Sequence, residues 1–79
     1  SSLAKPYVQI GFFSVEANAR RTADNLSNSG VVTSVVPGES NGKSFWRVIV
    51  GPSATSADRA EVLKTVKSKG FSDAYFVTN

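Results

Sequence analysis

Ser44–Val50 (SFWRVIV) is the stretch of sequence that decides the fold. Its aromatic and β-branched residues predict a strand, which Gly51-Pro52 ends. Successive side chains of a strand point to opposite faces of a sheet, so its residues separate into two sets. One set is wholly apolar and is predicted to enter the core: Trp46, Val48 and Val50. The other set is predicted to face away from the core: Phe45, Arg47 and Ile49.

A strand and a helix are predicted at the start of the chain. Tyr7–Phe13 (YVQIGFF) has strand composition, and Gly11 marks where the strand bends or ends, which leaves Phe12 in a loop. Ser14 is the expected N-cap of a helix that stops at Gly30. The apolar residues of this helix recur at helical spacing: Val15, Ala19, Ala23 and Leu26.

The remaining predicted elements precede and follow Ser44–Val50 in the sequence. Val31–Val36 is predicted to pair with it as an antiparallel hairpin, through a connection that holds Pro37, Gly38 and Asn41-Gly42. Thr55 and Asp58 resemble a capping box that opens a second helix, with Ala60, Leu63 and Val66 on its apolar side and Gly70 at its end. Phe71–Val77 is the last predicted strand.

An internal repeat supports this order of elements. A shift of forty places aligns Val8 with Val48, Gly11 with Gly51, Ala17 with Ala57 and Gly30 with Gly70. Each half is then a β-α-β unit, and right-handed crossovers put both helices on the same side of one sheet. The predicted fold is α+β, a split β-α-β (ferredoxin-like) β-α-β-β-α-β arrangement with a four-stranded antiparallel sheet. We expect residues 1–6 to be a linker and residues 7–79 to be the domain.

Composition excludes several classes of function. The 79 residues contain no cysteine and no histidine, which removes thiol nucleophiles, the usual zinc ligands and the neutral-pH proton shuttle. We therefore expect no metal site and no cofactor. No apolar run is long enough to insert into a membrane, and we expect a monomeric module. The net charge of +3 is too small for a dedicated nucleic-acid binder.

The face of the sheet turned away from the helices, which we call the open face, is predicted to carry the function. Its predicted residues are unusually aromatic for a solvated sheet surface: Tyr7, Gln9, Phe45, Arg47, Ile49, Tyr75 and Val77. In the first and last strands, the residues predicted to face the helices are Val8, Ile10, Ala74 and Phe76. An exposed apolar patch of this kind commonly marks a binding site, and both sugars and nucleobases would suit it.

The sequence resembles the SPOR domain, a family named for sporulation and cell-division proteins. The resemblance rests on V-Q-I-G-F-F in the first strand, a Ser-led helix containing Ala17, W-R-V-I-V-G-P in the third strand, and two helices that end at glycine. It covers Pro6 to Thr78. The family pattern places ligand contacts at Gln9, Phe12, Phe45, Arg47 and Tyr75; its position at Phe12 is often serine, so stacking is expected there instead of hydrogen bonding.

The resemblance implies a non-catalytic, bacterial module that binds septal peptidoglycan. The expected ligand is a denuded glycan strand of alternating GlcNAc and MurNAc that lacks stem peptides, and the expected location is the periplasm at the division septum. A membrane- or lipid-anchored parent protein would be brought there by the module. A cell-division protein, an amidase or a lytic transglycosylase of the rare lipoprotein A type would fit that role.

Two alternatives share the predicted topology. RNA-recognition domains stack bases on strand aromatics, and Tyr7 and Phe45 could serve, but K-S-F-W-R-V-I-V lacks their basic-Gly-aromatic pattern. Acylphosphatases require a phosphate-binding loop with an arginine after the first strand, where this chain has Phe12-Phe13-Ser14. The scattered carboxylates also form no evident glycosidase pair. Nucleic-acid binding and catalysis are therefore disfavoured.

Overall fold

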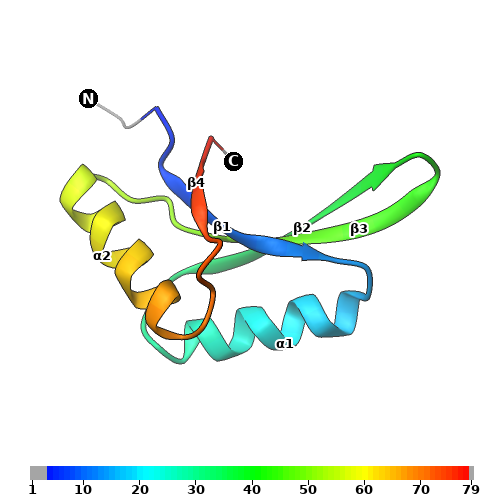
Figure 1. Cartoon of the computed structure of the whole chain (residues 1–79), viewed down its shortest axis with the longest axis horizontal. Helices are drawn as coiled ribbons and strands as arrows, with labels where there is room; N and C mark the ends of the chain where they lie inside the picture. The colour runs from blue at the N-terminus through cyan, green and yellow to red at the C-terminus, as the bar shows by residue number, and fades with distance from the viewer. Residues whose placement is uncertain (1–3, 79) are drawn as a thin grey trace.

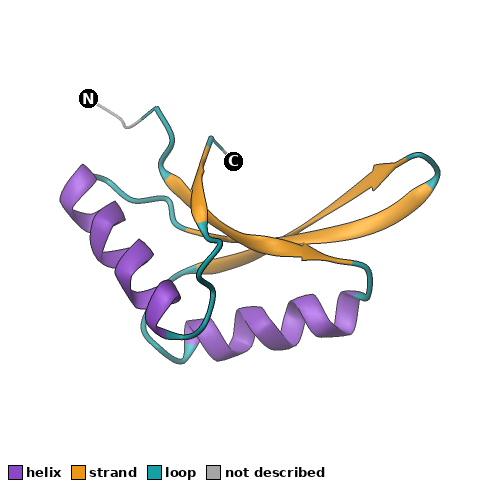
Figure 2. Cartoon of the chain, viewed as in Figure 1, coloured by secondary structure: helices purple, strands orange, loops and turns teal. Residues whose placement is uncertain are grey.

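Four strands form one antiparallel sheet, and two helices cover one of its faces (Figures 1 and 2). This computed structural model describes residues 4–78. The elements, in chain order, are β1 (Tyr7–Phe13), α1 (Glu16–Ser27), β2 (Thr33–Ser40), β3 (Lys43–Val50), α2 (Ser56–Ser68) and β4 (Tyr75–Val77). The strands lie in the order β2-β3-β1-β4. The split β-α-β fold predicted from the sequence is confirmed.

The core lies between the sheet and the helices, as the alternation of the strands predicted. Val8 is opposite Val50 on β3 and opposite Phe76 on β4, so one row of apolar side chains crosses three strands. Buried residues of this layer come from two strands, both helices and the turn before β4: Val8, Ile10, Ala19, Ala23, Leu26, Val48, Val50, Val66 and Ala74. Trp46 and Phe76 pack against this layer and are half-buried, which confirms their predicted side.

A β-bulge at Ile10 divides β1 into two parts. Gln9 is opposite Ile49, and Gly11 is opposite Val48, which is directly adjacent to Ile49 in β3. Two steps along β1 therefore match one step along β3, so Ile10 is an extra residue. An extra residue shifts the alternation of the strand by one. The bulge thus places Phe12 opposite Arg47, on the open face, and the expectation that Phe12 lies in a loop is wrong.

The β2–β3 hairpin is longer and tighter than the sequence predicted. β2 begins at Thr33 instead of Val31 and continues through Pro37 and Gly38 to Ser40. Asn41 and Gly42 alone form the turn, with φ of 54° and 77°. Two consecutive positive φ values are typical of the type I′ turn, whose twist matches that of the flanking strands. Because β2 is an edge strand, the missing N–H of Pro37 is tolerated.

The helix ends match the sequence signals only in part. Thr55 caps α2, since its Oγ1 accepts a hydrogen bond from the backbone N–H of Asp58 at 3.1 Å. In α1 the N-cap is Val15, which makes no side-chain capping bond, so the assignment to Ser14 is wrong. Val15 is 49% exposed and does not belong to the apolar side of α1, and Ala60 of α2 is likewise exposed.

The last strand is shorter than predicted because a turn occupies its expected beginning. The N–H of Phe71 donates to the carbonyl of Val66 at 3.1 Å, and the N–H of Ala74 donates to the carbonyl of Phe71 at 3.2 Å. The first bond closes the end of α2 around Gly70, whose φ is 103°, and the second closes a turn over residues 71–74. β4 therefore starts at Tyr75, although Ala74 already occupies the predicted core position.

The segment before β1 is bonded to the domain where it is described. The carbonyl of Pro6 accepts a hydrogen bond from the N–H of Ser53 at 2.8 Å, and the carbonyl of Lys5 accepts one from Nη1 of Arg59 at 3.0 Å. The guanidinium of Arg59 also lies 4.0 Å from the centre of the Phe76 ring. Residues 1–3 of the expected linker, and Asn79 of the expected domain, lie outside the described residues.

Candidate functional site

The open face is formed by residues of all four strands. The pairing of β2 with β3 puts Val36 opposite Arg47 and Gly38 opposite Phe45 on this face. The pairing of β1 with its neighbours adds Tyr7 opposite Val77, Gln9 between Ile49 and Tyr75, and Phe12 opposite Arg47. Both helices lie on the other side of the sheet (Figure 2). All eight residues expected in the site therefore share one face.

Two phenylalanine rings form an aromatic pair on this face. The ring centres of Phe12 and Phe45 are 5.4 Å apart, with an interplanar angle of 73°. Such an edge-to-face arrangement is favourable for aromatic pairs. The Phe45 ring lies against Gly38 so closely that a methyl group there would be 2.5 Å from two ring carbons. Gly38 thus lets the ring lie flat on the hairpin, while Phe12 stays 61% exposed.

Three polar side chains form a hydrogen-bonded chain beside the aromatic pair. The Nε of Arg47 donates to Oε1 of Gln9 at 2.7 Å, and Nε2 of Gln9 donates to the hydroxyl of Tyr75 at 2.6 Å. These side chains come from β3, β1 and β4, which are adjacent strands. Arg47 is half-buried and Tyr75 is 51% exposed. Arg47 and Tyr75 thus stand at the two ends of this hydrogen-bonded series of side chains, where a ligand can reach them.

Two of the expected site residues are buried, although they occupy open-face positions. Gln9 is 2% exposed and Ile49 is 4% exposed. Neither belongs to the core layer on the helix side. The expectation that they face solvent is therefore wrong: they form the floor of the site, since each strand in the middle of a sheet is flanked by side chains from both neighbours. Alternation shows which face a side chain joins, but not what covers it.

Tyr7 and Val77 extend the open face toward the ends of the chain. Both are half-buried, and they are directly opposite each other on β1 and β4. A methyl group at Gly51 would lie 3.1 Å from Cδ1 of Tyr7, so the tyrosine ring packs close to this glycine. The close contact with its own chain makes Tyr7 a poorer candidate for ligand contact than Phe12.

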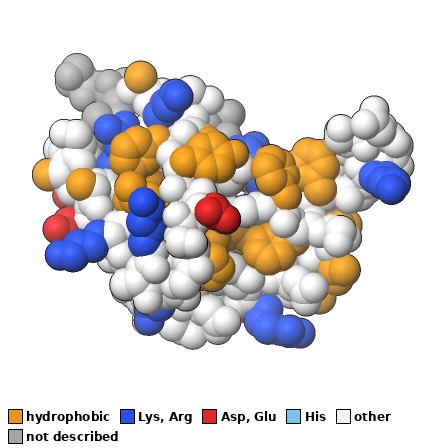
Figure 3. All heavy atoms as spheres, viewed as in Figure 1, with side chains coloured by type: hydrophobic (Ala, Val, Ile, Leu, Met, Phe, Trp, Pro, Cys, Tyr) orange, Lys and Arg blue, Asp and Glu red, His pale blue; other side chains and the backbone are white. Residues whose placement is uncertain are grey.

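Charge is distributed unevenly between the two layers. The acidic residues of the chain lie on the helices, in the turn before β4, and at Glu39, which is opposite Ser44 on the helix side of the hairpin. Within residues 4–78, no acidic residue takes an open-face strand position. The open-face strand positions among the described residues therefore hold aromatic and cationic side chains and no acidic ones. Figure 3, which views the sheet from the side, shows hydrophobic groups along the hairpin and the middle of the molecule, with basic and acidic groups among them.

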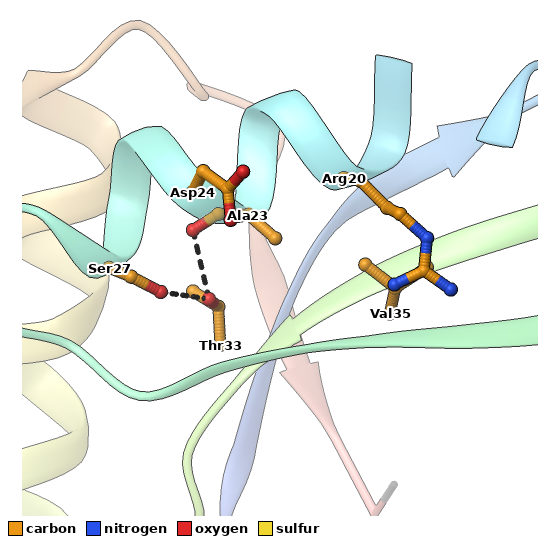
Figure 4. A pocket seen from close by; sticks show the side chains of 6 residues that line it. All are labelled: Arg20, Ala23, Asp24, Ser27, Thr33 and Val35. Atoms are coloured by element: carbon orange, nitrogen blue, oxygen red, sulfur yellow. Dashed lines mark hydrogen bonds between the residues drawn. The ribbon is translucent and has the colours of Figure 1, made fainter. Parts of the chain in front are cut away.

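Concave regions also occur on the helix side of the sheet. One lies between α1 and β2 and is lined by Arg20, Ala23, Asp24, Ser27, Thr33 and Val35 (Figure 4). Two of its polar side chains are engaged locally: Thr33 donates to the carbonyl of Ala23 at 2.9 Å, and Arg20 bonds to Glu16 at 2.7 Å. This hollow contains none of the residues that the sequence singled out for ligand binding.

The described residues offer no group of side chains that could hold a metal ion, and neither of the two helices among residues 4–78 is long and apolar enough to cross a membrane.

A two-layer β-α-β-β-α-β fold with an aromatic, cationic sheet face defines a binding module of the ferredoxin-like class. A family model described as "SPOR domain" matches residues 3–78. The chain therefore belongs to the SPOR domain family, whose members are periplasmic, non-catalytic modules that bind peptidoglycan in cell division.

Searches of the curated proteins and of the solved structures returned no match to this chain.

Proposed function

We propose that this domain binds peptidoglycan glycan strands without stem peptides on its open face, and thereby brings its parent protein to the division septum. The observation that carries the proposal is the exposed Phe12–Phe45 pair next to the Arg47–Gln9–Tyr75 chain. Membership of the SPOR family supports peptidoglycan as the ligand. The choice of stripped glycan is what the resemblance to the family implies, and the chemistry of the face supports it.

The apolar faces of the sugar rings would pack on Phe12, Phe45 and the ring of Tyr75. Aromatic side chains provide a large contact area at a small cost in conformational entropy, because few torsions are fixed. The guanidinium of Arg47 would bind the lactyl carboxylate of N-acetylmuramic acid. That carboxylate is free only when the stem peptide has been removed, and charge-assisted bonds of this kind are stronger than neutral ones.

Stem peptides would weaken binding for two reasons. The amide that joins a stem peptide to the lactyl group removes the negative charge that Arg47 attracts. The peptide also adds bulk above a sheet face whose middle is already filled by buried side chains, Gln9 and Ile49. Specificity then arises from a lost charge and a steric clash. For a shallow site we expect a Kd in the micromolar range, about −8 kcal/mol.

A pull-down on purified sacculi, with and without amidase pretreatment, tests the proposal. Amidase treatment should increase the amount of wild-type domain bound. Arg47→Ala should lower binding to treated sacculi about tenfold, whereas Arg21→Ala, which removes an exposed arginine from α1, should leave it unchanged. Equal binding to treated and untreated sacculi would contradict recognition of stripped glycan.

A further inference from the structure

We infer that Gln9 is a positioning residue that sets the direction of the hydrogen bonds on the open face. It would not contact the ligand itself, since it is 2% exposed. Its amide would instead make Tyr75 present its hydroxyl hydrogen to the ligand, and it binds Arg47 without adding a negative charge. This inference rests on the proposed function and adds the chemistry that selects the ligand.

The Gln9 amide can take only one orientation between its two neighbours. An arginine Nε can only donate a hydrogen bond, and Nε of Arg47 lies 2.7 Å from the Gln9 side chain. The oxygen of the amide must therefore face Arg47. The nitrogen of the amide then faces the opposite neighbour, Tyr75.

The orientation of the Gln9 amide determines the role of the Tyr75 hydroxyl. An amide nitrogen can only donate, so the oxygen of Tyr75 must accept the 2.6 Å hydrogen bond from Nε2 of Gln9. A tyrosine hydroxyl has a single hydrogen, and that hydrogen cannot point back to Gln9. It is directed elsewhere, on a side chain that is 51% exposed. Tyr75 therefore offers a donor to a ligand on the open face.

The result is a face that offers donors to its ligand. Gln9 is neutral, so its bond to Arg47 brings no negative charge to the face, and no acidic residue among 4–78 takes an open-face strand position. Ligand groups that only accept hydrogen bonds, above all carboxylates and then acetamido carbonyls, match this face. Groups that must donate match it less well, because the oxygen of the Gln9 amide is buried and already accepts from Arg47.

The first test needs no ligand. Side-chain NMR of 15N-labelled domain should show that the Nε–H of Arg47 exchanges with water at least tenfold more slowly than that of the exposed Arg21. Gln9→Met, which has a similar length and cannot accept from Arg47 in the same way, should remove this protection, while backbone spectra confirm that the variant is folded. Equal exchange at Arg47 and Arg21 in the wild type would overturn the inference.

The second test is a double-mutant cycle on binding of amidase-treated glycan fragments. Tyr75→Phe alone should weaken binding about three- to tenfold, the usual value of one hydrogen bond. Gln9→Glu should weaken it about tenfold or more, because a carboxylate accepts from both neighbours, turns the Tyr75 hydroxyl inward and neutralises Arg47. In the Gln9→Glu background, Tyr75→Phe should then have no further effect.

Controls separate this inference from the proposed function. Asn18→Asp makes the same amide-to-carboxylate change on exposed α1 and should leave binding unchanged. Fragments whose carboxylates have been reduced to alcohols should bind the wild type more weakly. An unchanged effect of Tyr75→Phe in the two Gln9 backgrounds would overturn the inference even if the wild type binds glycan. Protected Arg47 without any glycan binding would overturn the proposed function and leave the arrangement of the three side chains intact.

Discussion

Phe12 and Phe13 are neighbours in the chain but lie on opposite faces of the sheet. Phe12 is opposite Arg47 and is 61% exposed, whereas Phe13 is opposite Trp46 and packs against the core. The bulge at Ile10 determines this division, because without it the alternation from Val8 would send Phe12 inward. A single extra residue thus decides which of two identical side chains is available to a ligand.

The first prediction follows from this difference. Phe12→Ala should weaken binding to amidase-treated sacculi about three- to tenfold, since an aromatic contact contributes about 0.5–1.5 kcal/mol. Its free energy of unfolding should fall by only about 0.5–1.5 kcal/mol, because the side chain is exposed and loses mainly its contact with Phe45. Phe13→Ala is the matched control and should be destabilising by about 2 kcal/mol or more in urea unfolding. A Phe12 variant that unfolds while the Phe13 variant does not would show that the bulge is misplaced.

Trp46 and Arg47 give a second prediction at the scale of single residues. Trp46→Ala should lower the free energy of unfolding by about 2–3 kcal/mol, below the usual cost for a buried tryptophan, because this ring is only half-buried. Arg47→Ala should weaken sacculus binding while the fold persists. Circular dichroism during thermal unfolding distinguishes the two effects. The reverse outcome would mean that the register of β3 is wrong by one residue.

At the scale of elements, the long hairpin is the feature that sequence patterns described least well. Pro37 and Gly38 are typical of a turn, yet both are paired strand residues, opposite Trp46 and Phe45. An edge strand tolerates proline, and the Phe45 ring covers the glycine, so both residues fit the sheet for reasons that involve the partner strand. The turn propensity of Pro37 and Gly38 reflects only their own backbone preferences and contains no information about contacts with the partner strand.

Gly38 gives the prediction for the hairpin. Gly38→Ala would bring a methyl group within 2.5 Å of the Phe45 ring, so the ring must move away from its place on the open face. Glycan binding should fall about threefold or more, by the size of a lost aromatic contact, while the fold persists because only the end of a side chain has to shift. Gly11→Ala is the control, since nothing lies within 4 Å of a methyl group there. Unchanged binding by Gly38→Ala would show that the position of Phe45 is unimportant.

The order of the elements and the two faces of the sheet could be predicted from the sequence because apolar periodicity is a local signal. Val8, Val48 and Phe76 were assigned to the core in this way, and the structure confirms them. The bulge at Ile10 and the burial of Gln9 and Ile49 could not be predicted, because they depend on which residues of other strands are adjacent. Gly11 was the sole local sign of an irregularity in β1.

At the scale of the whole molecule, the hairpin tip and α2 lie at opposite ends of an elongated body of 37 × 25 × 18 Å, and β4 lies nearer its middle (Figure 1). The bonds of Lys5 and Pro6 to α2 and to the segment after β3 fix the direction in which the chain enters the domain.

The salt dependence of binding tests the electrostatics of this open face. Arg47 is the one cationic side chain among the eight residues of the proposed site, so a tenfold rise in salt concentration should lower glycan affinity only about fivefold, as expected for a single ion pair with a polyanion. RNA bound through several phosphates would lose affinity far more steeply over the same range. Titrations of fluorescent glycan fragments and of a single-stranded RNA oligonucleotide at several salt concentrations provide the comparison. A steep slope for glycan, or RNA affinity that matches glycan affinity at physiological salt, would show that the face is a general polyanion site instead of a surface for stripped glycan.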